Sequence, residues 1–290
     1  MERIHTPAAM RRWADARRAE GVRIGLVPTM GYLHEGHVSL VRIAKAQECG
    51  AVAASIFVNP TQFGPGEDYE KYPRDEARDL AMLDAAGVDA VYLPGVKDMY
   101  PKGHETFVEV PGVSQGLCGA ARPGHFRGVA TVVAKLFLAS KPHVAVFGEK
   151  DYQQLAVIRA MTRDLDFGIE IVGAPIVREE DGLAKSSRNV YLRGGDRMAA
   201  RCLSRGLFRA KELFGKGERD AETLVAAAGA AIEGEPLAKL EYVEGRDPLT
   251  LTPLSGLVGA VTILVAAKVG PARLIDNITL ENHSGGGDAS

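Results

Sequence analysis

The sequence lacks several features that would assign a common function class at once. Neither of the glycine-rich motifs GxxxxGK[S/T] and GxGxxG occurs anywhere in the 290 residues. Their absence removes the main support for ordinary P-loop phosphotransfer and for dinucleotide binding. Lysine and arginine total 35 against 37 acidic residues, which gives a net charge of −2. Nonspecific binding of nucleic acid therefore has no electrostatic basis.

Cysteines and long apolar runs are also scarce. The three cysteines, Cys49, Cys118 and Cys202, are scattered and form no CxxC pair, which argues against a disulfide framework and for a reducing compartment. No run approaches the ~20 apolar residues of a membrane-spanning helix. The arginines near the N-terminus flank no apolar core of the kind that a signal peptide carries. We therefore expect a cytoplasmic protein without a membrane partner.

The apolar residues that are present follow an alternating pattern up to about residue 175. A first helix is expected to begin at Pro7 and to stop at Gly21. The next expected strands are 22–27, 51–58, 88–93, 107–110, 143–147 and 169–172, and the expected helices are 38–48, 74–86, 128–139 and 152–165. Near-continuous apolar strands separated by amphipathic helices predict an α/β fold, with a parallel sheet covered by helices on both faces.

The pattern changes after about residue 175. Expected helices at 197–214 and 221–232 are followed by expected strands at 240–243, 260–267 and 272–279. Strands that cluster after helices predict a smaller α+β domain. We therefore expect one domain over 1–175, a second over 176–283 that carries the segment KSSRN, and a disordered tail at 284–290.

The most informative segment is VPTMGYLHEGH, residues 27–37. It lies between an expected strand and an expected helix, where backbone N–H groups and the helix dipole can face an anion. His34 and His37 are three residues apart and can share one helical face. A zinc helix of the HExxH type needs a spacing of four, so a metal role is disfavoured. Besides the plain alternative of a helix cap and a surface imidazole, we expect both to bind phosphate oxygens.

The segment GEKDYQQ, residues 148–154, follows another expected strand. Ligands of parallel sheets gather beyond the carboxyl ends of the strands. Lys150 offers a point charge for phosphate, and Asp151 offers a helix cap or a ligand for a ribose hydroxyl or Mg²⁺. Gln154 lies one turn further on nearly the same face as Lys150. Taken alone, the segment is typical of a capped helix with a solvated lysine; its place at the carboxyl end of a strand makes a binding role about equally compatible.

Three further polar segments are candidates for binding. NPTQF at 59–63 contains Gln62, whose amide suits hydroxyl groups and a carboxylate. KSSRN at 185–189 contains Arg188, which can bind phosphate bidentately. The glycine- and arginine-rich segment 119–128 is either a lid or a connection. The structural alternative is a turn for NPTQF and a polar linker between domains for KSSRN.

Five segments taken together resemble the pantoate–β-alanine ligase family and occur in the family's order. The family has a Rossmann-like, nucleotidyltransferase-like fold and is distantly similar to class I aminoacyl-tRNA synthetases, whose HIGH and KMSKS elements correspond here to HEGH and KSSRN. The segments are PTMGYLHEGH at 28–37, SIFVNPTQFGPGEDYEKYPR at 55–74, GLCGAARPGHFRGVATVVAKLF at 116–137, FGEKDYQQLAVIR at 147–159 and REEDGLAKSSRNVYL at 178–192.

The resemblance implies an ATP-dependent ligation in two steps. The carboxylate of (R)-pantoate would attack the α-phosphorus of ATP, giving pantoyl adenylate and pyrophosphate. The amine of β-alanine would then attack the acyl carbon, giving pantothenate (vitamin B5, a precursor of coenzyme A) and AMP. The resemblance further implies Mg²⁺ bound mainly by phosphates and a homodimer, and it leaves the protein ligands of the metal unknown.

The resemblance also implies roles for individual residues. Gln62 and Gln154 would bind pantoate, and Gln62 would lie near β-alanine as well. Lys185 departs from the apolar residue usual in the family; it either adds phosphate affinity or points to solvent. The implied catalytic residues are His34, His37, Lys150 and Arg188, with His37 as the proton donor of the family. The implied ATP-binding residues are Met30, Gly31, Tyr32, Leu33, His34, Glu35, Gly36, His37, Gly148, Glu149, Lys150, Asp151, Val177, Lys185, Ser186, Ser187 and Arg188.

Two other function classes use similar sequence features. Nucleotidyl transfer to a phosphate or nucleotide acceptor would share the histidine loop, but glutamines rather than a basic acceptor pocket argue against it. A nonenzymatic nucleotide sensor or an RNA-binding relative of the synthetases would also keep this loop. The net charge of −2 and the lack of a basic stripe disfavour RNA.

Overall fold

The computed structural model describes residues 1–282, which form two compact units. The first unit contains Met1–Glu179 and Ala184–Asn189, so that the whole KSSRN segment at 185–189 groups with it. The second unit contains Glu180–Leu183 and the residues from Val190 on. The tail expected at 284–290 lies outside the described residues. Within residues 1–282, no helix has the length and apolar character needed to span a bilayer.

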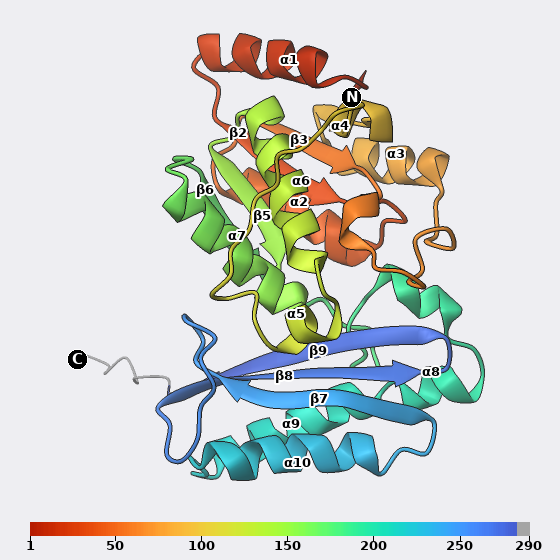
Figure 1. Cartoon of the computed structure of the whole chain (residues 1–290), viewed down its shortest axis with the longest axis vertical. Coiled ribbons are helices and arrows are strands. Elements are labelled where there is room, and N and C mark those ends of the chain that lie inside the picture. Colours follow the sequence, from red (N-terminus) through yellow and green to blue (C-terminus); the bar gives the residue numbers. More distant parts are fainter. Residues whose placement is uncertain (283–290) are drawn as a thin grey trace. The chain divides into compact units, whose positions relative to one another are not determined.

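A six-stranded sheet forms the centre of the first unit (Figure 1). Its strands are β1 (Glu2–Ile4), β2 (Ile24–Thr29), β3 (Ala51–Ile56), β4 (Ala90–Tyr92), β5 (Val144–Gly148) and β6 (Glu170–Ala174). They are all parallel and lie in the order β1-β4-β3-β2-β5-β6. The order reverses between β2 and β5, which makes the carboxyl ends of these two strands the expected ligand-binding position.

Helices connect the strands of this sheet and cover it. They are α1 (Pro7–Ala19), α2 (Glu35–Ala46), α3 (Glu76–Ala85), α4 (Val96–Met99), α5 (Leu117–Ala121), α6 (His125–Ser140) and α7 (Tyr152–Asp164), with 3₁₀ turns η1 (Pro60–Gln62), η2 (Glu149–Asp151) and η3 (Ser187–Tyr191). Thr6 caps α1 by accepting from the Ala9 N–H, and Pro7 occupies the first turn, as the sequence predicts. Buried apolar side chains of β2, β3 and β5, among them Val27 and Val146, pack against Val41 of α2.

The short strand predicted at 107–110 is wrong, because this segment pairs with no strand. The N–H of Val108 instead donates to the Thr131 hydroxyl of α6 at 2.9 Å. The Phe107 ring stacks under the guanidinium of Arg127, 3.9 Å from its centroid. Side chains of α6 thus bind the segment that alternation alone assigned to a sheet. The sequence pattern also missed β1, a three-residue strand.

The second unit is an antiparallel sheet with three helices. Helices α8 (Gly195–Ala199), α9 (Cys202–Gly215) and α10 (Ala221–Glu233) precede strands β7 (Ala238–Arg246), β8 (Ala260–Val269) and β9 (Ala272–Glu281), which lie in the order β7-β8-β9. The single helix predicted over 197–214 is interrupted at Ala200 and Arg201, where bonds between residues three apart tighten the chain. The predicted fold class, a Rossmann-like parallel sheet with a smaller α+β part, is confirmed.

Candidate active site

The two histidines of the first motif form the N-terminus of α2. His34 is the N-cap, and its Nδ1 accepts from the Gly36 N–H at 3.1 Å. The Nδ1 of His37 accepts in turn from the His34 N–H at 3.2 Å. The ring centroids lie 4.1 Å apart. This is a capping box built from two imidazoles, so the cap expected as the plain alternative exists, and it fixes the orientation of both rings.

These backbone bonds determine where the imidazole protons lie. Because both Nδ1 atoms accept from backbone N–H groups, each neutral ring carries its proton on Nε2. Burial lowers the pKa of His34 to about 4, helped by the ammonium of Lys150, and burial beside His34 lowers the pKa of His37 to about 3. At neutral pH the two rings therefore offer two N–H donors and no charge.

His34, His37 and His125 all have a lowered pKa, which predicts that acid destabilises the folded state. The pKa of His125 is also lowered to about 4, mainly by burial. These rings take up protons more readily in the unfolded chain, near pH 6.5, so stability is full above that pH and falls with the pH below it. From about pH 7.5 to about pH 5 we expect a loss of about 2 kcal/mol per ring in the free energy of unfolding, measured by urea denaturation. The variant His37→Gln should lose less; an unchanged pH dependence would contradict the assignment.

Lys150 and Asp151 lie beyond β5, in η2. The Nζ of Lys150 is 3.5 Å from Oδ2 of Asp151. Burial opposes the ionisation of Asp151, but Lys150 and Arg188 hold the pKa of this carboxyl below its usual value. Asp151 makes no side-chain capping bond to α7. It is therefore a carboxylate directed at the cavity rather than the helix cap that the sequence also allowed.

Arg188 is bound to a carboxylate that the sequence did not single out. Its Nε and Nη2 donate to Oδ2 and Oδ1 of Asp68 at 2.8 and 2.9 Å, and its guanidinium lies 5.5 Å from the centroid of the Tyr72 ring. The same loop is bound to the segment that follows β6, because the backbone N–H of Lys185 donates to the Val177 carbonyl at 2.9 Å. Asp68 and Tyr72 lie within a segment of the family resemblance, but their residue types alone indicate only a solvated loop.

Gln62 is held by three residues that were also missed. Its Oε1 accepts from Asn59 Nδ2 at 3.0 Å and its Nε2 donates to Met30 Sδ at 3.1 Å, which leaves the second N–H of this amide for a ligand in the cavity. Its backbone carbonyl lies 3.2 Å from Arg122 Nη2 and 2.8 Å from His125 Nδ1. A bidentate pair with Glu67 fixes Arg122. The 119–128 segment, which was either a lid or a connection, thus positions Gln62.

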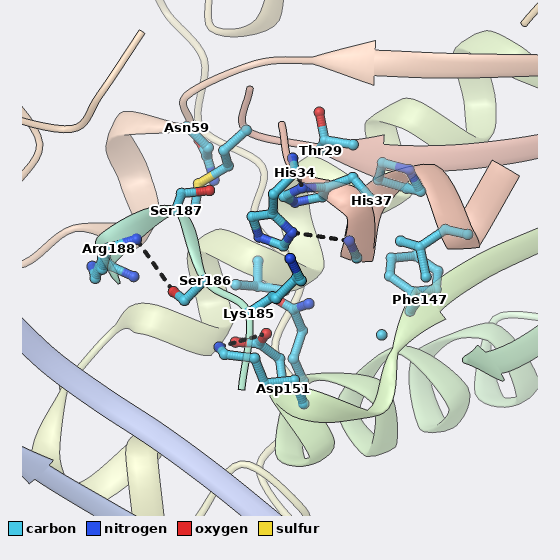
Figure 2. A pocket seen from close by; sticks show the side chains of 18 of the residues that line it. Thr29, His34, His37, Asn59, Phe147, Asp151, Lys185, Ser186, Ser187 and Arg188 are labelled. Carbon is cyan, nitrogen blue, oxygen red and sulfur yellow. Dashed lines mark hydrogen bonds and ion pairs between the residues drawn. The ribbon is translucent and has the colours of Figure 1, made fainter. Parts of the chain in front are cut away.

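A cavity of about 200 Å³ joins these loops. It is too large for a single water, and all of its lining residues belong to the first unit. Figure 2 shows His34, Lys185 and Asp151 directed into this space. The lining residues that the sequence had singled out are Met30, His34, Gly36, His37, Gln62, Gly148, Lys150, Asp151, Gln154, Val177, Lys185, Ser186, Ser187 and Arg188. Its apolar wall includes Pro28, Leu40, Val129, Val132, Val133, Leu136 and Phe147.

Five residues expected to bind ATP do not line this cavity: Gly31, Tyr32, Leu33, Glu35 and Glu149. The amides of Tyr32 and Leu33 donate to Asp79. Glu35 is exposed and pairs with Arg42. Their assignment to ATP stays a prediction.

A parallel sheet with a cavity of mixed polar and apolar side chains at its switch point is typical of α/β nucleotide-binding enzymes. A family model described as pantoate-beta-alanine ligase matches residues 2–279. The chain belongs to the pantoate–β-alanine ligase family and is an enzyme of the class that forms C–N bonds, as the resemblance predicts. It is 52% identical to the pantothenate synthetase of Heliobacterium modesticaldum over 281 residues, which cover 97% of this chain and 100% of that protein.

Two solved structures are similar along nearly the whole chain. Pantothenate synthetase from Thermus thermophilus has a TM-score of 0.90 and 48% identity, with coverage of 97% of this chain and 100% of that one. The pantoate-beta-alanine ligase of Francisella tularensis, complexed with beta-gamma ATP and beta-alanine, has a TM-score of 0.78 and 34% identity, with coverage of 96% and 97%. The similarity therefore includes both units of the chain.

Proposed function

We propose that this enzyme condenses (R)-pantoate with β-alanine, using ATP and passing through pantoyl adenylate, with release of pyrophosphate and AMP. The observation that carries the proposal is the cavity itself. Two neutral imidazole donors, cationic side chains from two further loops and the Gln62 amide line one space with an apolar wall. The Francisella relative, whose complex contains beta-gamma ATP and beta-alanine, supports the choice of substrates.

The first step needs compensation of negative charge. A carboxylate that approaches a triphosphate is repelled, so positioned donors and cations must lower the barrier. Lys150 and Lys185 supply positive charge, and the Nε2–H groups of His34 and His37 supply donors to phosphate oxygens. A preorganised donor to developing charge is typically worth ~3–4 kcal/mol. Because His37 is neutral in the free enzyme, it stabilises by donating a hydrogen bond rather than by its charge.

The second part of the cavity suits pantoate. Gln62 presents the second N–H of its amide to an oxygen of the substrate, because Asn59 bonds its Oε1 and Met30 Sδ accepts from its other N–H. Gln154 lines the same space from α7. The apolar wall would bury the branched carbon skeleton of pantoate, whose hydroxyl and carboxylate oxygens then meet the amides. The amine of β-alanine would attack beside Gln62.

We further propose that ATP binds with Mg²⁺, which would neutralise charge on the phosphates. Asp151 is the carboxylate among the lining residues that suits this ion, which prefers oxygen ligands and keeps most of its waters. No group of three or more His, Cys, Asp or Glu side chains in residues 1–282 would hold a metal without the nucleotide. The homodimer and the cytoplasmic location remain predictions.

Product analysis tests the proposed reaction. With ATP, pantoate and β-alanine together, we expect AMP, pyrophosphate and pantothenate in equal amounts. With β-alanine withheld, we expect pantoate-dependent exchange of labelled pyrophosphate into ATP, since adenylate formation is reversible. ADP and phosphate would contradict the proposal, and a dinucleotide-like product would indicate nucleotidyl transfer. Calorimetric binding of ATP without turnover would indicate a sensor.

A further inference from the structure

The turn between β2 and α2 has an unfavourable backbone conformation. Gly31 has φ of 80° and the next residue, Tyr32, has φ of 49°. Glycine adopts this left-handed region readily, but a tyrosine there costs on the order of 1 kcal/mol. Contacts from other parts of the structure must therefore hold the turn that leads directly into His34.

A buried carboxylate of α3 supplies these contacts. Asp79 is only 1% exposed. Its Oδ2 accepts from the Tyr32 N–H at 2.6 Å, and its Oδ1 accepts from the Leu33 N–H at 2.7 Å. Consecutive N–H groups of a left-handed turn form a concave anion site. The sequence suggested that such amides face a phosphate, but an acidic side chain of the protein itself fills this site.

The fit around the carboxylate is close. A Cβ on Gly31 would lie 3.0 Å from Asp79 Oδ2 and 3.0 Å from Ile56 Cγ2. Burial raises the pKa of Asp79, so keeping an ionised carboxyl here has a cost that its two backbone bonds offset in part. An asparagine would provide one acceptor instead of two.

Tyr32 also contacts the 185–188 loop, which contains Arg188. The Ser187 hydroxyl donates to the Tyr32 carbonyl at 3.0 Å. The guanidinium of Arg78, the neighbour of Asp79 on α3, lies 5.2 Å from the centroid of the Tyr32 ring. Tyr32 therefore connects α3 with the 185–188 loop, immediately before the histidines that cap α2.

We propose that Asp79 is a positioning residue for adenylate formation: by holding the 31–33 turn, it sets the His34 and His37 rings relative to the 185–188 loop. The inference rests on the proposed function. Asp79 does not line the cavity, so it acts through the turn and not on the substrates. Displacement of catalytic groups by about 1 Å can cost roughly 100-fold in rate.

The test replaces one acceptor. Asp79→Asn keeps the shape of the side chain but turns an amide donor toward one backbone N–H. We expect kcat for AMP release to fall roughly 10- to 100-fold, with a KM for ATP that changes much less. In the substrate-free enzyme, the NMR resonances of the His34 and His37 imidazoles should shift. The matched control is Asp84→Asn, which removes the same charge from an exposed position of α3 and should leave both readouts unchanged.

A second variant tests the same turn in case Asp79→Asn does not fold. Gly31→Ala keeps the chemistry of the carboxylate but strains the same turn, because φ of 80° disfavours alanine and its Cβ would lie 3.0 Å from Asp79 Oδ2. It should give the same selective fall in kcat. Wild-type kcat in either folded variant, or equal falls in Asp79→Asn and Asp84→Asn, would overturn the inference. If the wild-type enzyme makes no AMP from pantoate and β-alanine, the proposed function fails. The imidazole resonances of Asp79→Asn then still decide whether this residue positions the rings, and unshifted resonances would overturn that role.

Discussion

Replacing Lys150 by methionine is expected to lower pantoate-dependent pyrophosphate exchange by about 100-fold or more. Both imidazoles are neutral, and the guanidinium of Arg188 makes a short bidentate pair with Asp68, whereas Lys150 has one longer contact of 3.5 Å with Asp151 Oδ2; we therefore expect much of the positive potential at the triphosphate to come from lysine side chains. Methionine retains most of the length and the apolar stem of lysine and removes the charge together with its N–H donors. The folded state should therefore be preserved.

A second readout of the same variant is the protonation of His34. The Lys150 ammonium contributes to lowering the pKa of this ring, so its removal should raise that pKa. NMR titration of the imidazole measures the change. Lys97→Met, at an exposed position of α4, is the matched control and should leave the exchange rate unchanged. Exchange within a few-fold of wild type in Lys150→Met would remove this residue from the reaction.

Gly128→Ala is expected to have the largest effect on the architecture of the cavity. A Cβ at this position of α6 would lie 2.3 Å from the Thr61 carbonyl oxygen and 2.7 Å from the Gln62 nitrogen. Backbone atoms cannot rotate away as a flexible side chain can. We expect a loss of about 1–3 kcal/mol in the free energy of unfolding, as is usual for overpacking. Urea denaturation measures this loss.

The displaced turn should also impair the binding of pantoate. Asn59 Nδ2 donates both to the Gly128 carbonyl and to Gln62 Oε1, so a shift of α6 against η1 misplaces the amide of Gln62. A raised KM for pantoate is the expected result. Gly215→Ala, in a helix where a Cβ would meet nothing within 4 Å, is the control and should be neutral or slightly stabilising. Equal stability of the two variants would show that the close approach of α6 to η1 does not constrain this site.

Local sequence patterns were sufficient to predict the placement of those site residues that lie at the ends of regular helices and strands. His34 and His37 face one side because residues three apart at a helix start must do so. Lys150 reaches the cavity because it comes two residues after the end of a central parallel strand. Short-range rules of this kind also predict the alternation of strands and helices and hence the fold class.

The partners of these residues did not follow from any local rule. Asp79 is one of several acids on an amphipathic helix, and nothing nearby in the sequence distinguishes it from the exposed Asp84. Its bonds reach back 46 and 47 positions along the chain, and those of Arg188 reach back 120. The segment 107–110 has the alternation of a strand, but it contacts helix α6 instead of pairing with a strand: the Val108 N–H donates to the Thr131 hydroxyl.

The sequence by itself determined the class of fold, the family, and which side chains carry donors and charge. Only the tertiary structure decided their protonation and orientation, because both depend on burial and on hydrogen bonds from residues distant in the chain. It made the two imidazoles neutral Nε2–H donors, bound Arg188 to Asp68, and filled the amide-lined turn before α2 with the carboxylate of Asp79.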